Sequence, residues 1–164
     1  MTLDAPGERS SEHCRLATSD DLARIAELAG TLVAESTDAK GGPIWSSREA
    51  RPAPHLDSYR ALLDVGDAQV VVGTIDDVVV GFGAVEIERL RTSANLGVVT
   101  DLYVEPQARA IGVGEAMIDA LLAFCVEHNC IGVDALALPG ARATKNFFEG
   151  HSFTARALVM HRPL

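Results

Sequence analysis

A strand, a glycine-containing turn and a long helix follow one another in the second half of the chain, and this order limits the folds available to it. Residues 96–104 have the apolar, β-branched composition of a strand, which Pro106 ends. A helix is predicted over about 112–128, and an apolar strand over 133–138. A crossover of this length predicts that the two strands pair in parallel, with a right-handed connection.

The rest of the chain adds antiparallel strands and further helices. Strands are predicted over residues 15–18, 69–75, 78–87 and 154–161, with Asp76-Asp77 as a hairpin turn. Helices are predicted after a cap at Thr18 or Ser19, over about 55–64 and over 142–149, whereas 36–54 has too many glycines and prolines for regular structure. These elements predict a single-domain α/β fold: a mixed, mostly antiparallel sheet with a parallel strand-helix-strand unit and helices on both faces.

Composition narrows the class of protein. A length of 164 residues fits one domain, which we expect over 14–164 after a loose tail at 1–13. The net charge of -9 argues against nucleic-acid binding, because such binding needs clustered basic residues. No apolar run is long enough for a membrane span. Three cysteines without paired or zinc-type spacing predict free thiols, no metal site and a cytoplasmic location.

The turn before the long helix, R-A-I-G-V-G at 109–114, has the features of an anion site. Its glycines allow a ligand to approach the backbone closely, and the free amides and dipole of a helix N-terminus favour a phosphate. Arg109 can add a charged contact. The spacing does not fit a P-loop or a dinucleotide fingerprint, since Met117 stands where the latter needs a small residue. A turn that merely tightens the strand-to-helix junction is the simpler alternative.

Four segments together resemble the GNAT superfamily of acyl-CoA-dependent N-acyltransferases. The turn at 109–114 matches the family's pyrophosphate signature, and D-L-Y-V-E-P at 101–106 is similar to the strand that precedes it. R-L-A-T-S-D-D-L at 15–22 is similar to the family's opening, and N-F-F-E-G-H-S-F at 146–153 to its last helix. The resemblance covers about residues 14–162.

The resemblance implies acetyl-CoA as the acyl donor and a sheet that splays beside its binding strand. Backbone groups of that strand would pair with the pantetheine arm, and one of its amides would polarise the thioester carbonyl. The implied cofactor-binding residues are Leu102, Tyr103, Val104, Arg109, Ala110, Ile111, Gly112, Val113, Gly114, Glu115 and Asn146.

Acyl transfer to an amine also requires proton transfer, because a lysine-like amine with a pKa near about 10.4 is protonated at neutral pH. Asp101 is the predicted base, with Glu86, Glu88 and Glu105 as alternatives. In the family a tyrosine of the last helix often returns a proton to the thiolate, but Phe148 stands there. Tyr103 is therefore the predicted catalytic acid, with His151 or no acid as alternatives.

The sequence thus predicts an N-acetyltransferase that acts on a primary amine by direct attack. The acceptor would be a small molecule or a peptide, the resemblance places the acceptor pocket near Trp45 in the 36–54 segment, and a homodimer is the predicted assembly. The alternative function is a regulatory module of the same fold that binds acyl-CoA without turnover.

Overall fold

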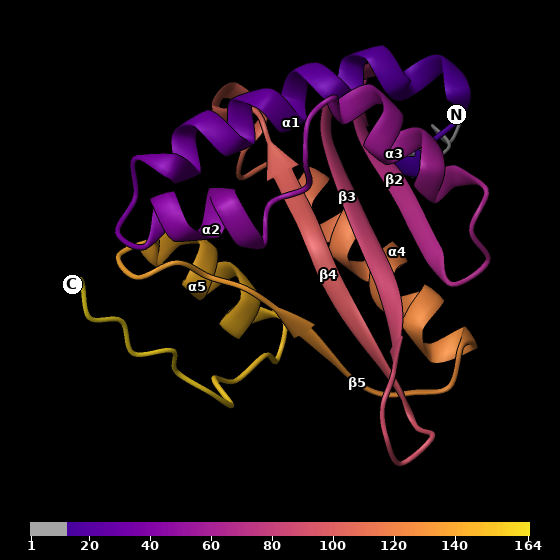
Figure 1. The fold of residues 1–164 in the computed structure, drawn as a ribbon. Helices are drawn as coiled ribbons and strands as arrows, with labels where there is room; N and C mark the ends of the chain where they lie inside the picture. The colour runs from indigo at the N-terminus through magenta and orange to yellow at the C-terminus, as the bar shows by residue number, and fades with distance from the viewer. Residues whose placement is uncertain (1–12) are drawn as a thin grey trace, which may run out of the picture.

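The computed structural model describes residues 13–164 (Figure 1). Five strands form one sheet in the order β1-β2-β3-β4-β5. Their bounds are Cys14–Leu16 (β1), Ala68–Ile75 (β2), Val78–Arg89 (β3), Asn95–Val104 (β4) and Cys130–Ala135 (β5). Neighbouring strands are antiparallel except β4 and β5, which are parallel. This confirms the predicted mixed sheet and its parallel strand-helix-strand unit.

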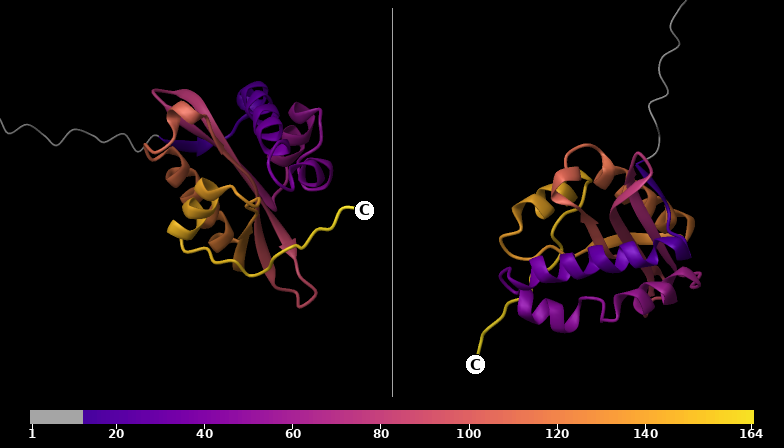
Figure 2. Two further views of the ribbon diagram at one scale, coloured as in Figure 1. Left: turned by 90° about the vertical axis from the view of Figure 1, so that its left-hand side faces the viewer. Right: turned by 90° about the horizontal axis from the view of Figure 1, so that it is seen from above.

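Helices cover both faces of the sheet (Figure 2). One face carries α1 (Leu22–Thr37), α2 (Gly42–Arg48) and α3 (His55–Leu63), and the other carries α4 (Val113–Glu127) and α5 (Arg142–Gly150). Two short 3-10 turns, at Ser19–Asp21 and Pro106–Ala108, precede α1 and α4 respectively. The predicted fold class, with helices on both faces, is therefore confirmed.

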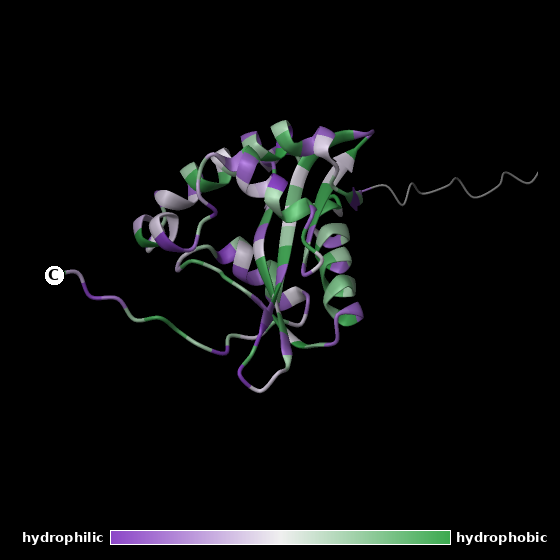
Figure 3. Cartoon of the chain, turned by 45° about the vertical axis from the view of Figure 1, so that its right-hand side comes forward, coloured by the Kyte–Doolittle hydropathy of each residue, from purple (hydrophilic) through white to green (hydrophobic). Residues whose placement is uncertain are grey.

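Two apolar clusters, one on each face, hold these layers together (Figure 3). On the α1–α3 face, Ile25 and Tyr59 pack against Phe82 of β3. On the α4 face, Met117 and Leu121 pack against the central strands. Most of these side chains are completely buried, so the position of β4 between the two clusters is fixed from both sides.

Two local predictions about chain reversals are confirmed. Asp76 and Asp77 both have positive φ, 48° and 63°, as a tight hairpin turn between β2 and β3 requires. Asn129 has φ 54° and ends α4 in the left-handed conformation. The strand that follows begins at Cys130 and ends at Ala135, so the predicted bounds of 133–138 were displaced toward the C-terminus.

The prediction of irregular structure across 36–54 was wrong in its middle, where α2 forms. Gly41, with φ 81°, makes the turn out of α1, and a side chain on Gly42 would collide with the carbonyl of Ser36. Pro43 lies in the first turn of α2, where a helix needs no N–H donor, so it starts the helix instead of breaking it.

The predicted strand over 154–161 was also wrong. The chain after Phe153 has no regular secondary structure; Arg156 is still paired with Asp134 of β5, and the chain then ends away from the sheet (Figures 1 and 2). A strand needs a hydrogen-bonded neighbour, and none of the strands of residues 13–164 pairs with this segment. Among the helices of residues 13–164, none combines the length and apolar composition needed to cross a membrane.

The start of α1 provides a test of folding stability. The carboxylate of Asp21 accepts hydrogen bonds from the Thr18 N–H (2.8 Å) and from the Arg15 guanidinium (2.7 and 2.9 Å). The Arg15 hydrogen bonds, together with that from Thr18, hold the pKa of Asp21 below its usual range against the opposing effect of burial. A lowered pKa in the folded state contributes stability above the unfolded pKa of about 3.9, and the contribution disappears as pH falls through the folded value.

We therefore expect Asp21→Asn to lower the free energy of unfolding by about 1 kcal/mol near neutral pH. The difference from wild type should shrink as pH falls below about 4, where the wild-type carboxyl becomes protonated. Urea denaturation at both pH values measures this. Asp57→Asn is the control, because Asp57 forms an exposed pair with Arg60 and should change stability by less than about 0.5 kcal/mol. An equal loss at both pH values would contradict the role of the charge.

Candidate active site

A β-bulge in β4 shapes the centre of the sheet. The register with β3 pairs Ala84 with Asp101 but Val85 with Val99, so Thr100 is an additional residue in β4. A bulge of this kind places consecutive side chains close together and bends the strand. Thr100 Oγ1 donates to Asp101 Oδ2 at 2.9 Å, so both polar groups lie together on the face covered by α1–α3.

Beyond the bulge, β4 has a free edge on the side of β5. The parallel pairing with β5 ends at Val99 and Ala135, and the described chain places no strand beside β4 after that point. The Glu105 N–H donates to Val80 O on β3, and backbone groups alternate in direction along a strand. The backbone groups of Leu102 and Val104 therefore face the free edge, while those of Asp101 and Tyr103 face β3.

The free edge leads directly into the turn at 109–114. Ala110 has φ 64° and Gly112 has φ 99°, which makes a strongly curved loop before α4. Gly112 is the N-cap of α4 and no side chain caps the helix, so the first amides remain available to a ligand. A strand edge and a helix N-terminus are thus joined in one continuous surface that can take an elongated anion.

The predicted cofactor-binding residues differ in what they present to that surface. The Val113 side chain is completely buried against the α4 core, so only its backbone can face a ligand. Ile111, Glu115 and Asn146 are exposed, with Asn146 on α5. Phe147 of α5 lies against Gly114, which brings α5 next to the start of α4.

Glycine stands at positions 112 and 114 of the turn for different structural reasons. Gly112 needs its positive φ, and a Cβ there would be in ordinary contact with the His13 ring at 3.8 Å. A Cβ on Gly114 would lie 3.2 Å from the Phe147 ring, a tight contact that the ring would have to relieve by a small shift. The sequence predicts that both glycines allow a phosphate to approach; the structure adds close packing against α5 at Gly114.

Arg109 closes the outer end of the free edge. Its Nε donates to Val104 O at 2.8 Å, and its guanidinium lies 5.6 Å from the centre of the Tyr103 ring. Glu35 of α1 accepts a hydrogen bond from Tyr103 Oη at 3.1 Å and lies 3.7 Å from the Arg109 guanidinium. The predicted acid and the predicted phosphate ligand are therefore in one cluster with Glu35, which the sequence did not indicate.

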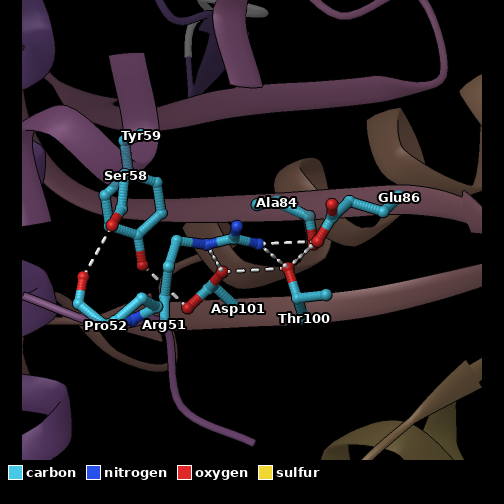
Figure 4. A network of polar contacts seen from close by, with 8 residues as sticks. All are labelled: Arg51, Pro52, Ser58, Tyr59, Ala84, Glu86, Thr100 and Asp101. Atoms are coloured by element: carbon cyan, nitrogen blue, oxygen red, sulfur yellow. Dashed lines mark hydrogen bonds and ion pairs between the residues drawn. The ribbon is translucent and has the colours of Figure 1, made fainter. Parts of the chain in front are cut away.

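Asp101 is at the centre of a polar network on the α1–α3 face (Figure 4). Its carboxylate accepts hydrogen bonds from Tyr59 Oη at 2.8 Å and from Arg51 Nε at 3.4 Å, besides Thr100. The same guanidinium donates to Glu86 Oε2 at 2.8 Å and lies 5.3 Å from the centre of the Tyr59 ring. Arg51 therefore bridges an acidic group on β3 and one on β4.

The tyrosines of both clusters keep their protons. Burial is the main cause that raises the pKa of Tyr59, and the adjacent charge of Asp101 adds to it. Burial also raises the pKa of Tyr103, with the charge of Glu35 as the next cause. At neutral pH both hydroxyls are hydrogen-bond donors to carboxylates.

A hollow of about 210 Å³ opens beside this network. It is lined by Arg48, Glu49, Ala50, Arg51, Pro52, Glu86, Thr100 and Asp101. Arg51 and Tyr59 were not predicted as site residues. Arg51 stands in a proline-rich segment without periodicity, and Tyr59 has the spacing of a core residue, so nothing in the sequence distinguished either of them.

The candidate bases lie in different environments in the structure. Glu86 lies in the hollow with Asp101, and its side chain is 42% exposed, against 6% for Asp101. Glu105 is paired with Arg24 of α1 at 2.7 Å. Glu88 is exposed farther along β3 and does not line the hollow. The structure thus brings together Asp101 and Glu86, and leaves the other two carboxylates outside.

In α5, Phe148 stands at the position where the resemblance predicts a tyrosine. Phe148 is buried, and its ring lies 5.1 Å from that of Phe153. The His151 ring stacks on Phe147 at 4.4 Å, and its Nδ1 is 2.8 Å from Phe147 O. Phe148 therefore supplies packing to α5, and His151 is held against its own helix.

Ser152, two residues after the end of α5, has φ 66°, a left-handed conformation. A left-handed conformation costs a non-glycine residue about 1–2 kcal/mol. We expect Ser152→Gly to raise the free energy of unfolding by up to about 1 kcal/mol, since glycine loses some of the gain to its own chain entropy. Thermal and urea unfolding measure the change. Ser47→Gly within α2 is the control and should destabilise; a loss of stability at 152 would contradict the prediction.

The model of the Acetyltransferase (GNAT) family matches residues 27–153. The chain belongs to the GNAT acetyltransferase family. The match includes β4, the turn at 109–114 and α4, so the predicted resemblance to this family is confirmed. Among curated protein sequences, none matches this GNAT chain.

Solved structures agree on the fold. BH1408 protein from Bacillus halodurans, a tetramutant, has a TM-score of 0.78 at 18% identity, covering 92% of this chain and 99% of that one. Glucosamine-6-phosphate N-acetyltransferase from Arabidopsis thaliana has 0.67 at 19%, covering 92% and 96%. AAC(6')-Iy, in complex with the bisubstrate analog CoA-S-monomethyl-acetylneamine, has 0.72 at 16%, also covering 92% and 96%.

Proposed function

We propose that this protein moves an acetyl group from acetyl-CoA to a primary amine by direct attack of the amine on the thioester. The observation that carries the proposal is the continuous surface formed by the free edge of β4 and the uncapped start of α4. That surface offers strand-type hydrogen bonds to the amides of a pantetheine arm and helix amides to a pyrophosphate. The structural neighbour AAC(6')-Iy is in complex with a CoA analog, which supports the assignment.

On this proposal the backbone does most of the donor binding. The Leu102 and Val104 groups face the edge, so the Leu102 N–H is placed to donate to the thioester carbonyl oxygen as negative charge develops there. The amides of 110–115 would hold the pyrophosphate. Arg109 would leave Val104 O and pair with a phosphate oxygen, a charge-assisted contact that is stronger than the one it gives up.

The acceptor would enter through the hollow beside Asp101. Its lining contains three acidic residues, Glu49, Glu86 and Asp101, and two arginines, Arg48 and Arg51, so a cationic amine is favoured by an excess of one negative charge. Arg51 now occupies the carboxylates that an ammonium group would use, so binding requires the guanidinium to move aside. Asp101 would then accept the amine proton, directly or through water, with Glu86 as the more exposed alternative.

The proposed acid, Tyr103, would act from the other polar cluster. Its hydroxyl keeps its proton at neutral pH and now donates to Glu35. It would return a proton to the thiolate only if that hydrogen bond opens. A free thiol with a pKa near about 8.5 can also leave without an acid, so the protein does not depend on this step.

The decisive experiment combines acetyl-CoA with a panel of amines and measures free thiol together with the mass of the product. The panel should contain amino sugars, polyamines, amino acids and peptides with free N-termini and lysines. We expect acetyl-CoA to raise the melting temperature, because a ligand bound only by the folded state stabilises it, and at least one amine to gain an acetyl group. No shift of melting temperature well above millimolar acetyl-CoA would contradict the donor site.

A binding module without turnover is the second candidate, and the buried Phe148 at the family's acid position favours it. It predicts a shift of melting temperature with no acetylated product from any amine. The cytoplasmic location stays a prediction, supported by three cysteines that form no disulfide.

A further inference from the structure

The Arg51 guanidinium lies at the position that an acceptor ammonium group would take (Figure 4). Its Nη2 donates to Glu86 Oε2 at 2.8 Å and to Thr100 Oγ1 at 2.9 Å, and its Nε donates to Asp101 Oδ2 at 3.4 Å. Its central carbon lies 5.3 Å from the centre of the Tyr59 ring. Carboxylates, a hydroxyl oxygen and an aromatic ring are groups that recognise an organic cation, so this network is a cation site that already holds a cation.

The backbone around Arg51 is held by hydrogen bonds that do not involve the guanidinium. The Ala50 N–H donates to Trp45 O at 2.9 Å, and Pro52 O accepts a hydrogen bond from Ser58 Oγ at 2.6 Å. A largely buried ion pair also contributes little net stability, because the cost of taking both charges out of water offsets their attraction. The contacts of Arg51 therefore point to a role other than holding the connection between α2 and α3.

Arginine suits this place because it binds as a cation and does not react. A nitrogen that attacks a thioester must first lose a proton and have a free electron pair. The guanidinium is delocalised and keeps its proton throughout the physiological range of pH. Arg51 therefore imitates the charge of an acceptor amine and cannot be acetylated in its place.

The hollow gives the guanidinium space in which to move. Arg51 is part of the lining of this hollow of about 210 Å³, and its side chain is 14% exposed. Glu86, which it contacts, is 42% exposed. An incoming amine can therefore reach the carboxylates from the hollow while the guanidinium turns toward solvent, and the fastened backbone keeps the side chain near enough to return.

We infer that Arg51 is an internal pseudosubstrate, which holds the acceptor's place in the free protein and determines which amines can bind. The inference rests on the proposed function, because it concerns the same hollow. Displacement exchanges one cation for another at Glu86 and Asp101, so a simple alkylamine gains little from its charge alone. An acceptor that makes further contacts of its own displaces the guanidinium, and Arg51 thereby selects against small amines that lack such contacts.

The first test is the variant Arg51→Lys, which needs no knowledge of the natural acceptor. Incubation with acetyl-CoA alone should acetylate the new primary amine. Its ammonium form gives one proton to Asp101, its nitrogen forms the amide bond as the C–S bond breaks, and the second proton of the nitrogen goes to the CoA thiolate. Mass spectrometry should find one acetyl group at position 51, added at a rate independent of protein concentration. Arg60→Lys, exposed on α3, is the matched control and should react no faster than the protein's other lysines.

The second test removes the guanidinium with the variant Arg51→Gln. We expect kcat/KM for n-propylamine to rise by at least about tenfold, because the amine no longer has to replace hydrogen bonds between charged groups, and the Kd for CoA to stay the same. Methylguanidine added to this variant should compete with the amine and lower the rate again, which the loss of a purely structural contact would not produce. Arg60→Gln is the control and should behave as wild type.

An unmodified Arg51→Lys, or a kcat/KM that Arg51→Gln leaves unchanged, overturns the inference. The proposed function stands in either case if the wild type acetylates an amine of the panel described above. Absence of any acetylated nitrogen, both in that panel and in the two variants, contradicts the proposed function together with the inference. Circular dichroism checks that each variant is folded, and if one of them is not, the other decides the question.

Discussion

Replacing Asp101 by asparagine is expected to lower kcat/KM for amine acetylation by about 100-fold while leaving the Kd for CoA unchanged. Asparagine has nearly the same shape and still accepts a hydrogen bond from Tyr59, but it takes up no proton. The donor surface should not respond, because the backbone groups of Asp101 face β3 and not the free edge. Steady-state kinetics and calorimetry with CoA measure the two quantities.

The pH dependence of this variant distinguishes a base from a structural residue. The loss should be largest at low pH, where little of the amine is free and a proton acceptor matters most, and should decrease as pH approaches the amine pKa of about 10.4. Asp119→Asn, an exposed acid on α4, is the control and should behave as wild type. Wild-type rates at all pH values would assign the base elsewhere, with Glu86 as the first alternative.

Gly112→Val is expected to weaken CoA binding by at least about tenfold, a loss of 1.4 kcal/mol of binding free energy. A β-branched residue at φ 99° is strongly disfavoured, so the turn must change shape and the amides before α4 lose their common direction. The fold should lose about 1–3 kcal/mol of stability for the same reason. Calorimetry with CoA and urea unfolding measure the two losses separately.

Gly41→Val is the matched control, because Gly41 has a similar φ of 81° but lies in the turn between α1 and α2. It should lose comparable stability and retain normal affinity for CoA. If both variants bind CoA equally well, the turn at 109–114 does not hold the pyrophosphate. If both bind it equally poorly, the effect at Gly112 comes from general destabilisation.

The strand, turn and helix of the proposed donor surface were predictable because they are encoded locally. The strand, the turn and the helix follow one another over some thirty residues, and their glycines and apolar spacing are visible in the sequence. The same locality made the hairpin at Asp76-Asp77 and the end of α4 at Asn129 predictable, since each depends on one turn residue.

The polar network around Asp101, where we propose that the acceptor binds, could not be predicted as a whole, because tertiary structure assembles it. Arg51 and Glu86 are 35 positions apart and Tyr59 and Asp101 are 42 apart, yet each pair is joined by one hydrogen bond. No periodic pattern connects such residues. The prediction of a strand over 154–161 failed for a related reason: its composition is that of a strand, but a strand also depends on pairing with another part of the chain, which composition does not reveal.

β4 presents main-chain atoms at its free edge and side chains on its α1–α3 face, and this difference affects how substrate specificity can change. A ligand held by main-chain atoms is insensitive to which side chains the strand carries, so substitutions at Leu102 or Val104 are limited only by packing against α4. The hollow on the α1–α3 face is instead lined by side chains, many of them from the connection between α2 and α3. On the proposed function, substitutions in that connection would change which amine is accepted, while the acyl donor would continue to bind in the same way.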